Sequence, residues 1–111
     1  MRDPKTYLQH ILHAIERIEE YALDTDEEQF LSDFKTQDAI IRQLEIIGEA
    51  SRQLEEPFKQ QYPELPWRHM IALRNKLMHE YFGISVKVIW ETIKVDVPPV
   101  KKAVARLVSQ L

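Results

Sequence analysis

The segment WRHMIALRNKLMHEYFG, residues 67–83, predicts a helix with an arginine in the middle of its apolar side. Pro66 favours a helix start at Trp67, and Gly83 is a natural C-cap, so the helix is expected to end near Phe82. At about 100° per residue, Arg74 falls at about 340° when Trp67 is set at zero. The apolar side chains that share this arc with Trp67 are Met70, Ile71, Leu77, Met78, Tyr81 and Phe82.

An arginine in an apolar arc requires a partner, because burying an unpaired guanidinium costs several kcal/mol. One interpretation is a buried ion pair with Glu45 or Glu49 of the preceding helix. A second is that the long side chain extends its guanidinium to solvent, and a third is that Arg74 faces a cleft or a subunit interface. Asn75 and His79 lie along one margin of the arc, at about 80° and 120°. All three interpretations stay open at this point.

The rest of the chain predicts an all-α fold, a small up-and-down bundle of four to five helices plus a short one, in a single domain over residues 1–111. Gly48 and Ser51 lie beside the apolar stripe of the longest helix, where small residues allow another helix to approach. The first helix is expected over residues 4–23, with Asp3 as N-cap and Pro4 at its first position, and a short helix is expected to place Phe30, Leu31 and Phe34 over the core. A long helix over residues 37–58, capped by Thr36, should end before a break at QQYPELPW (residues 60–67). Ser85 is expected to cap a further helix that runs to about Val95, and Asp96, Pro98 and Pro99 should separate it from a last helix.

Composition excludes several classes of protein. The 111 residues include no cysteine, which excludes disulfides and thiol catalysis, and no apolar run long enough for a membrane span, so a cytoplasmic protein is expected. Residues 1–66 carry 7 Lys and Arg against 15 Asp and Glu, whereas residues 67–111 carry 8 against 3. A polyanion could therefore be attracted locally to the basic half, although the same gradient could serve solubility or subunit pairing.

The residues available for chemistry favour RNA cleavage without a metal or other cofactor. No phosphate-binding glycine loop, serine elbow or carboxylate cluster accompanies the motif, and His10 and His13 lack a third zinc ligand. Arginine can clamp a phosphate, and histidine can transfer protons while the ribose 2′-hydroxyl attacks. Arg74 and His79 lie about 140° apart on a straight helix, so they cannot both face one phosphate squarely. Two copies around a two-fold axis could complete the site, which predicts a homodimer.

RNKLMHEY reads as R-x4-H-x-Y and resembles the signature of the HEPN superfamily, in the form of the HepT-like (DUF86) toxins. The segments AIIRQLEIIGEASRQL, PELPWRHMIALRNKLMHEYFGI and VIWETIKVDVPPV also resemble family segments in the same order. This resemblance implies a dimeric helical bundle and an endoribonuclease toxin of a type VII-like toxin-antitoxin pair, with tRNA as a possible substrate.

By residue, the resemblance implies that Arg74 and His79 are catalytic and that Asn75 supports them. It implies that Tyr81 is adenylylated by a cognate minimal nucleotidyltransferase antitoxin of the MntA type. Tyr81 also lies within about 20° of Arg74 on the helix, so a phosphate on its hydroxyl would place negative charge near the guanidinium. Two alternatives stay open: a non-enzymatic partner subunit of a nucleotidyltransferase, and a helical scaffold in which Arg74 is only an ion-pair member.

Overall fold

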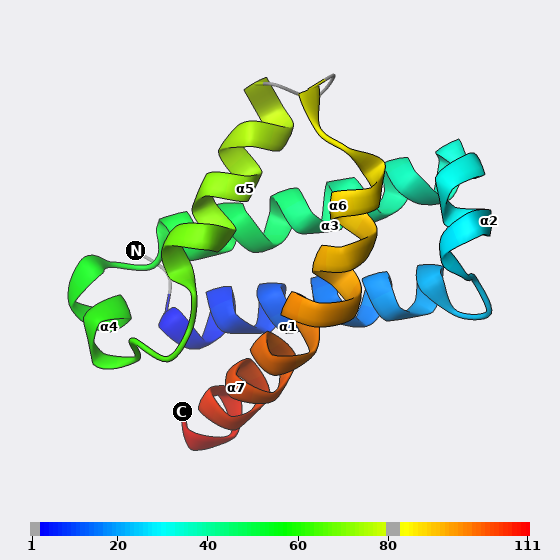
Figure 1. The fold of residues 1–111 in the computed structure, drawn as a ribbon. Coiled ribbons are helices and arrows are strands. Elements are labelled where there is room, and N and C mark those ends of the chain that lie inside the picture. Colours follow the sequence, from blue (N-terminus) through cyan, green and yellow to red (C-terminus); the bar gives the residue numbers. More distant parts are fainter. Residues whose placement is uncertain (1–2, 80–82) are drawn as a thin grey trace.

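The computed structural model describes residues 3–79 and 83–111, and within these ranges it is all-α with no strand (Figure 1). The all-α prediction is therefore confirmed. The elements are α1 (Pro4–Ala22), α2 (Glu27–Ser32), α3 (Phe34–Gln53), α4 (Glu56–Gln61), α5 (Trp67–His79), α6 (Val86–Glu91), the π-helical segment η2 (Thr92–Asp96) and α7 (Val97–Gln110).

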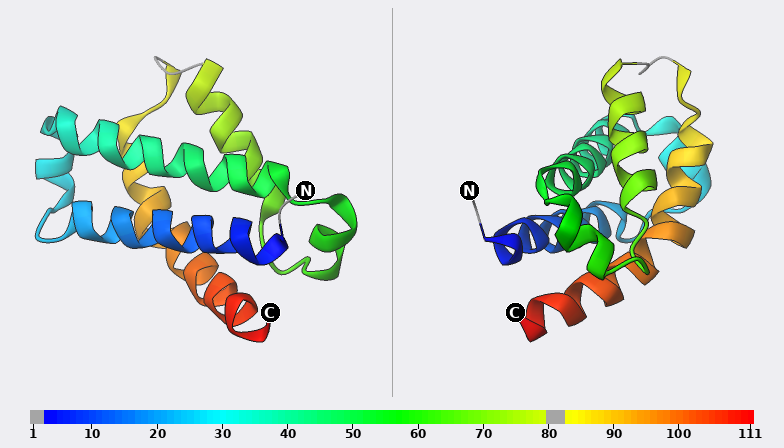
Figure 2. Two further views of the ribbon diagram at one scale, coloured as in Figure 1. Left: turned by 180° about the vertical axis from the view of Figure 1, so that it is seen from behind. Right: turned by 90° about the vertical axis from the view of Figure 1, so that its left-hand side faces the viewer.

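The helices form two layers. α1 and α3 lie side by side and antiparallel, and α5 and the α6–η2–α7 run cover one face of this pair (Figures 1 and 2). α5 packs on α3, whereas α7 packs on α1. The core lies between the layers and is filled by fully buried side chains such as Ile11, Ile40 and Val104. Burial of these apolar surfaces is the main force that holds α5, and thus Arg74, against α3.

The first two helices begin as their sequences indicate. The Asp3 carboxylate accepts a hydrogen bond from the backbone N–H of Lys5, Pro4 opens α1, and the helix ends one residue before the expected boundary. Phe30 of α2 is fully buried and lies 5.1 Å from the Trp90 ring, as expected for a residue that covers the core. Leu31 and Phe34 were expected to do the same, and this was wrong, because they are 43% and 75% exposed.

The predicted long helix has both ends elsewhere. Asp33, not Thr36, is its N-cap: the Asp33 carboxylate accepts hydrogen bonds from the backbone N–H and the hydroxyl of Thr36, so α3 begins at Phe34. α3 ends at Gln53, and α4 is a separate helix with Pro57 in its first turn. The prediction chose Thr36 although Asp33, three residues earlier, also offers a side-chain oxygen that can cap a helix, which explains the error.

Residues 86–110 are helical without the break that Asp96 and the two prolines predict. Helix α6 continues through η2 into α7, where the backbone N–H of Val97 donates to the carbonyl of Thr92. Pro98 and Pro99 follow in the first turn of α7, the position at which a missing N–H costs least. The wider π turn thus joins two helices that proline would otherwise separate.

Two further expectations concern caps, and one concerns membranes. Ser85 occupies the N-cap position of α6, but its side chain makes no capping hydrogen bond. The expected end of the motif helix near Phe82 lies outside the described residues, so the C-cap prediction for Gly83 stays a prediction. Across residues 3–79 and 83–111, no helix combines the length and apolar character needed to cross a membrane.

Candidate active site

Arg74 lies where α5 approaches α3 closely at Gly48. A Cβ atom placed on Gly48 of α3 would be 2.1 Å from the Cβ of Arg74 and 2.6 Å from the backbone oxygen of Met70. No side chain fits between these helices at this point, because real Cβ contacts of that length do not occur. The prediction that Gly48 permits a close helix approach is therefore confirmed, and the approach brings the Cβ and Cγ of Arg74 and the backbone oxygen of Met70 against α3.

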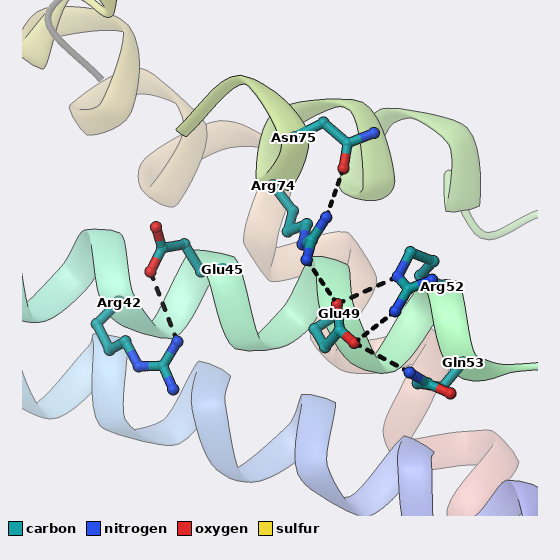
Figure 3. A network of polar contacts seen from close by, with 7 residues as sticks. All are labelled: Arg42, Glu45, Glu49, Arg52, Gln53, Arg74 and Asn75. Carbon is teal, nitrogen blue, oxygen red and sulfur yellow. Dashed lines mark hydrogen bonds and ion pairs between the residues drawn. The ribbon is translucent and has the colours of Figure 1, made fainter. Parts of the chain in front are cut away.

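The guanidinium of Arg74 is held by two oxygen atoms from different helices (Figure 3). Its Nη2 lies 3.0 Å from a carboxylate oxygen of Glu49 on α3, and its Nη1 donates a 2.8 Å hydrogen bond to Oδ1 of Asn75. The side chain is 18% exposed. Its Nε is buried and has no hydrogen-bond partner within the described part of the chain. Arg74 is thus a partly buried cation with donors still available.

The contact with Arg74 also fixes the orientation of the Asn75 amide. A guanidinium has donors and no acceptor, so the amide must present its oxygen to Arg74. The Nδ2 group of Asn75 consequently points away from Arg74, as Figure 3 shows, on a side chain that is exposed. The pair therefore presents amide and guanidinium donors in the same neighbourhood.

Glu49 accepts from three side chains. Arg52 donates from Nε and Nη2 at 3.2 and 2.9 Å, and Gln53 donates at 3.0 Å, in addition to the ion pair with Arg74. The hydrogen bonds from Arg52 and Gln53, with the charges of Arg52 and Arg74, lower the pKa of Glu49 to about 2 against the opposing effect of burial. Glu49 is therefore a carboxylate, not a carboxylic acid, at any pH near neutrality.

The structure decides between the two partners proposed for Arg74. Glu49 makes the ion pair, whereas Glu45, one turn earlier, lies 3.6 Å from Arg42 of the same helix. The apolar arc around Arg74 is divided: Leu77 is buried in the core, whereas Met78 is 51% exposed. Core packing therefore accounts for only part of this arc.

His79 does not join the cluster. It is exposed at the end of α5, and no hydrogen bond or ion pair links it to Arg74 or Asn75 among the residues that the structure describes. Tyr81, the predicted modification site, lies outside the described residues. The structure thus brings Arg74 and Asn75 together and leaves His79 apart, as the separation of about 140° on a helix predicts.

A surface groove of about 460 Å³ adjoins the cluster between α1 and α3. Glu49 lines the groove and also contacts Arg74, so the groove and the cluster lie next to each other. The other lining residues are Tyr7, His10, Arg42, Ile46, Ala50 and Gln53. An aromatic ring and a cation in one groove are the groups that stack bases and contact phosphates.

Apart from Glu49, the sequence did not predict the residues of α3 and α4 that lie around the candidate site. Arg52 and Gln53 follow Glu49 by three and four residues, a spacing that places them on one helix face and could have identified the cluster. Lys59 of α4 is buried and donates at 3.1 Å to the Ser51 carbonyl in the last turn of α3. Nothing in the sequence around Lys59 indicated that this lysine would be buried.

No group of three potential metal ligands occurs in the described residues. His10 and His13 are both exposed, and His10 lies edge-on to the ring of Tyr7 at 6.3 Å. The side chains at the Arg74 cluster are cationic donors, amides and a carboxylate already engaged by two arginines. Such a cluster suits an anion between donors.

Sequence and structure together define a class of protein. It is an all-α fold in which a helix with an R-x4-H motif packs on a partner helix through a glycine. The family model described as "Ribonuclease HepT-like" matches residues 11–107. The chain belongs to the ribonuclease HepT-like family. The resemblance to the HepT-like family that the sequence indicated is therefore confirmed. The family is one of ribonucleases, as that resemblance implies.

Individual relatives cover nearly the whole chain. A Thermococcus cleftensis protein named "Probable ribonuclease HepT" is 52% identical over 100 residues, which span 90% of this chain and 91% of that protein. The Methanocaldococcus jannaschii protein "Putative RNase MJ1380" is 43% identical over 93% of this chain and 94% of its own length. In the same organism, "Gamma-glutamylcyclotransferase and putative RNase MJ0434" is 40% identical over 99% of this chain but only 50% of its own length. No solved structure matches.

Proposed function

We propose that the chain is a metal-independent endoribonuclease and the toxin of a toxin-antitoxin pair, with Arg74 and His79 as its catalytic residues. The observation that carries the proposal is the position of Arg74, a partly buried guanidinium beside the exposed amide of Asn75 in a ribonuclease family. In the proposed reaction the ribose 2′-oxygen attacks the adjacent phosphorus, and the bond to the 5′-oxygen of the next nucleotide breaks. The products are a 2′,3′-cyclic phosphate and a 5′-hydroxyl.

Each residue has one role in this reaction. His79 transfers protons, either from the attacking 2′-hydroxyl or to the departing 5′-oxygen. Arg74 stabilises the charge that develops on the phosphate oxygens, with the Asn75 amide as an additional donor. The groove that contains Tyr7 and Arg42 supports the proposal of an RNA substrate, because an aromatic ring and a cation lie close to the Arg74 cluster.

A homodimer completes the proposed site. Arg74 is directed onto α3, whereas His79 is exposed at the helix end, so one chain does not aim both at one phosphate. In the dimer, two such pairs share a cleft, and the exposed Met78 contributes to the contact between copies. Sedimentation equilibrium tests this assembly, and a monomer at the concentration of a cleavage assay contradicts it.

The proposed antitoxin is a minimal nucleotidyltransferase of the MntA type that adenylylates Tyr81. The added phosphate would compete with substrate for Arg74 by charge and by volume. Mass spectrometry after co-expression tests this step, with Tyr81→Phe as the control that cannot be modified. An unmodified Tyr81 in a protein whose toxicity the partner suppresses would argue against adenylylation.

The central experiment compares His79→Ala with His69→Ala. Both histidines are exposed on α5, so the second variant controls for loss of an imidazole on this helix. In EDTA, wild type and His69→Ala should cut RNA and leave 2′,3′-cyclic phosphate ends, whereas His79→Ala should not. Equal cleavage by the two variants contradicts the mechanism. Absence of cleavage by wild type, with stable co-purification of the nucleotidyltransferase, favours the non-enzymatic partner subunit instead.

A further inference from the structure

Two adjacent residues of α3 fix the two ends of the Arg74 side chain. Gly48 admits the Cβ and Cγ atoms of Arg74 at the helix crossing, and Glu49 lies 3.0 Å from its Nη2. Between them, the backbone of α3 sets where the side chain starts and where its charged end lies. An arginine that is free in solution has many rotamers, and this arrangement restricts them before any substrate binds.

Glu49 is itself held in place. Three hydrogen bonds from Arg52 and Gln53 fix its carboxylate on α3, and its pKa of about 2 keeps it charged. The carboxylate that Arg74 contacts is therefore held and kept charged mainly by residues of α3 itself. A mobile carboxylate would move with the guanidinium, whereas the ordered carboxylate of Glu49 restricts the position of the guanidinium.

The contact leaves Arg74 able to bind an anion. A guanidinium has five N–H donors, and the contacts with Glu49 and Asn75 use one from each Nη. The carboxylate of Glu49 is shared between the guanidinium groups of Arg52 and Arg74, so the three side chains together carry one net positive charge. The cluster consequently attracts phosphate although Arg74 is paired.

We propose that Glu49 is a positioning residue that orders the guanidinium of Arg74 for the RNA phosphate. The inference rests on the proposed function, and it adds a residue that acts on the reaction through Arg74. Ordering the guanidinium in the free protein removes a loss of rotamer freedom from the step in which Arg74 meets the phosphate. Removal of the Glu49 charge should therefore slow the chemical step more than it weakens RNA binding.

The kinetic test compares Glu49→Gln with Glu45→Gln. Glu45 lies on the same helix but contacts Arg42, so the second variant removes a carboxylate that does not reach Arg74. For a short RNA, Glu49→Gln should lower kcat about tenfold and change KM less than threefold, whereas Glu45→Gln should match wild type. An unchanged kcat in Glu49→Gln overturns the proposal. A raised kcat also overturns it, because Glu49 would then hold Arg74 away from the substrate.

A second variant separates positioning from stabilisation of α3. Lys59→Met removes a hydrogen bond to the Ser51 carbonyl at the end of α3 but leaves every contact of Glu49 in place. It should lower the thermal unfolding temperature at least as much as Glu49→Gln while retaining most of the activity. Equal losses of activity in the two variants, in proportion to folded protein, overturn the positioning role.

Nitrogen NMR of the Arg74 guanidinium provides a measurement that requires no catalysis. Rotation about its Nε–Cζ bond should be slow in wild type and Glu45→Gln, and faster in Glu49→Gln. Equal rotation rates in all three overturn the proposal even if RNA is cut. If wild type does not cut RNA, the proposed function fails, and the NMR comparison still decides whether Glu49 orders Arg74.

Discussion

Gly48 and Arg74 occupy one crossing point, where the space that a side chain at Gly48 would need is taken by the Cβ and Cγ of Arg74. The glycine is in a helix and has no positive φ, so the close approach, not backbone conformation, requires it. Arg74, which is proposed to bind the substrate phosphate, can thus occupy its position only because Gly48 on the neighbouring helix has no side chain. This relationship couples helix packing to the geometry of the site.

Gly48→Ala should therefore lower both stability and activity. The added methyl group would meet the Cβ of Arg74 and a backbone oxygen, which cannot rotate away, so α5 must shift. Overpacking of this kind costs about 1–3 kcal/mol, a fall in Tm of several degrees for a chain of this size. Calorimetry measures it, and Gly83→Ala is the control, since a Cβ there meets nothing within 4 Å. Equal Tm values for the two variants would show that α5 adapts without cost.

Lys59→Met should destabilise the protein without touching the candidate site directly. The methionine retains an apolar stem in a site that is 8% exposed, but it cannot donate to the Ser51 carbonyl at the end of α3. Loss of a charged donor from a buried carbonyl costs about 1.5–3 kcal/mol. Urea unfolding measures the change, and Lys102→Met, on the exposed side of α7, should lie within about 0.5 kcal/mol of wild type. A neutral Lys59→Met would mean that water replaces the ammonium group.

The fold was predictable where local signals and tertiary packing agree. Pro4 after Asp3 marked the start of α1, and the apolar stripe of α3 marked its buried face. The errors arose where two signals compete, as at Asp33 and Thr36, which are both good caps. At Asp96 and the following prolines, a π turn resolves a conflict that local rules treat as a helix end. Local propensity thus identified elements and failed on how they join.

The site was predictable from α5 but not from α3. Helical projection placed Arg74 in the apolar arc and reduced its partner to Glu45 or Glu49, which share one helix face. Which of the two is in reach depends on where α5 crosses α3, and that crossing depends on the packing of the whole bundle. Gly48 indicated a close approach but did not identify its partner residue. The contacts of the Arg74 side chain therefore depend on how the helices pack and not on the local sequence alone.

Asn75 substitutions should distinguish an acceptor from a donor role. Asn75→Asp retains an oxygen for Arg74 but replaces the outward amide donors with negative charge, whereas Asn75→Ala removes the oxygen and the donors together. If the amide donates to the RNA phosphate, the aspartate should lower kcat/KM further than the alanine, by about tenfold more. If only the acceptor matters, the aspartate should be the milder change. Cleavage of one short RNA by both variants decides the order.

The pH dependence of stability should report the contacts of Glu49. Its pKa of about 2 in the folded protein is below the ordinary value of 4.5, so the unfolded chain binds the proton more readily. The contribution of Glu49 is therefore complete above about pH 5 and is lost as the pH falls towards 2. Because the side chain is 39% exposed, solvent screening limits that contribution to about 1 kcal/mol.

Urea unfolding of wild type and Glu49→Gln between pH 3 and 6 measures this contribution, and the difference between them should narrow as the pH falls. Arg52 is the largest cause of the lowered pKa, so in an Arg52→Gln background the same comparison should give a smaller difference with a weaker dependence on pH. A difference that stays constant across this range, or that widens towards acid, would mean that Glu49 stabilises the protein by packing and not by its charge.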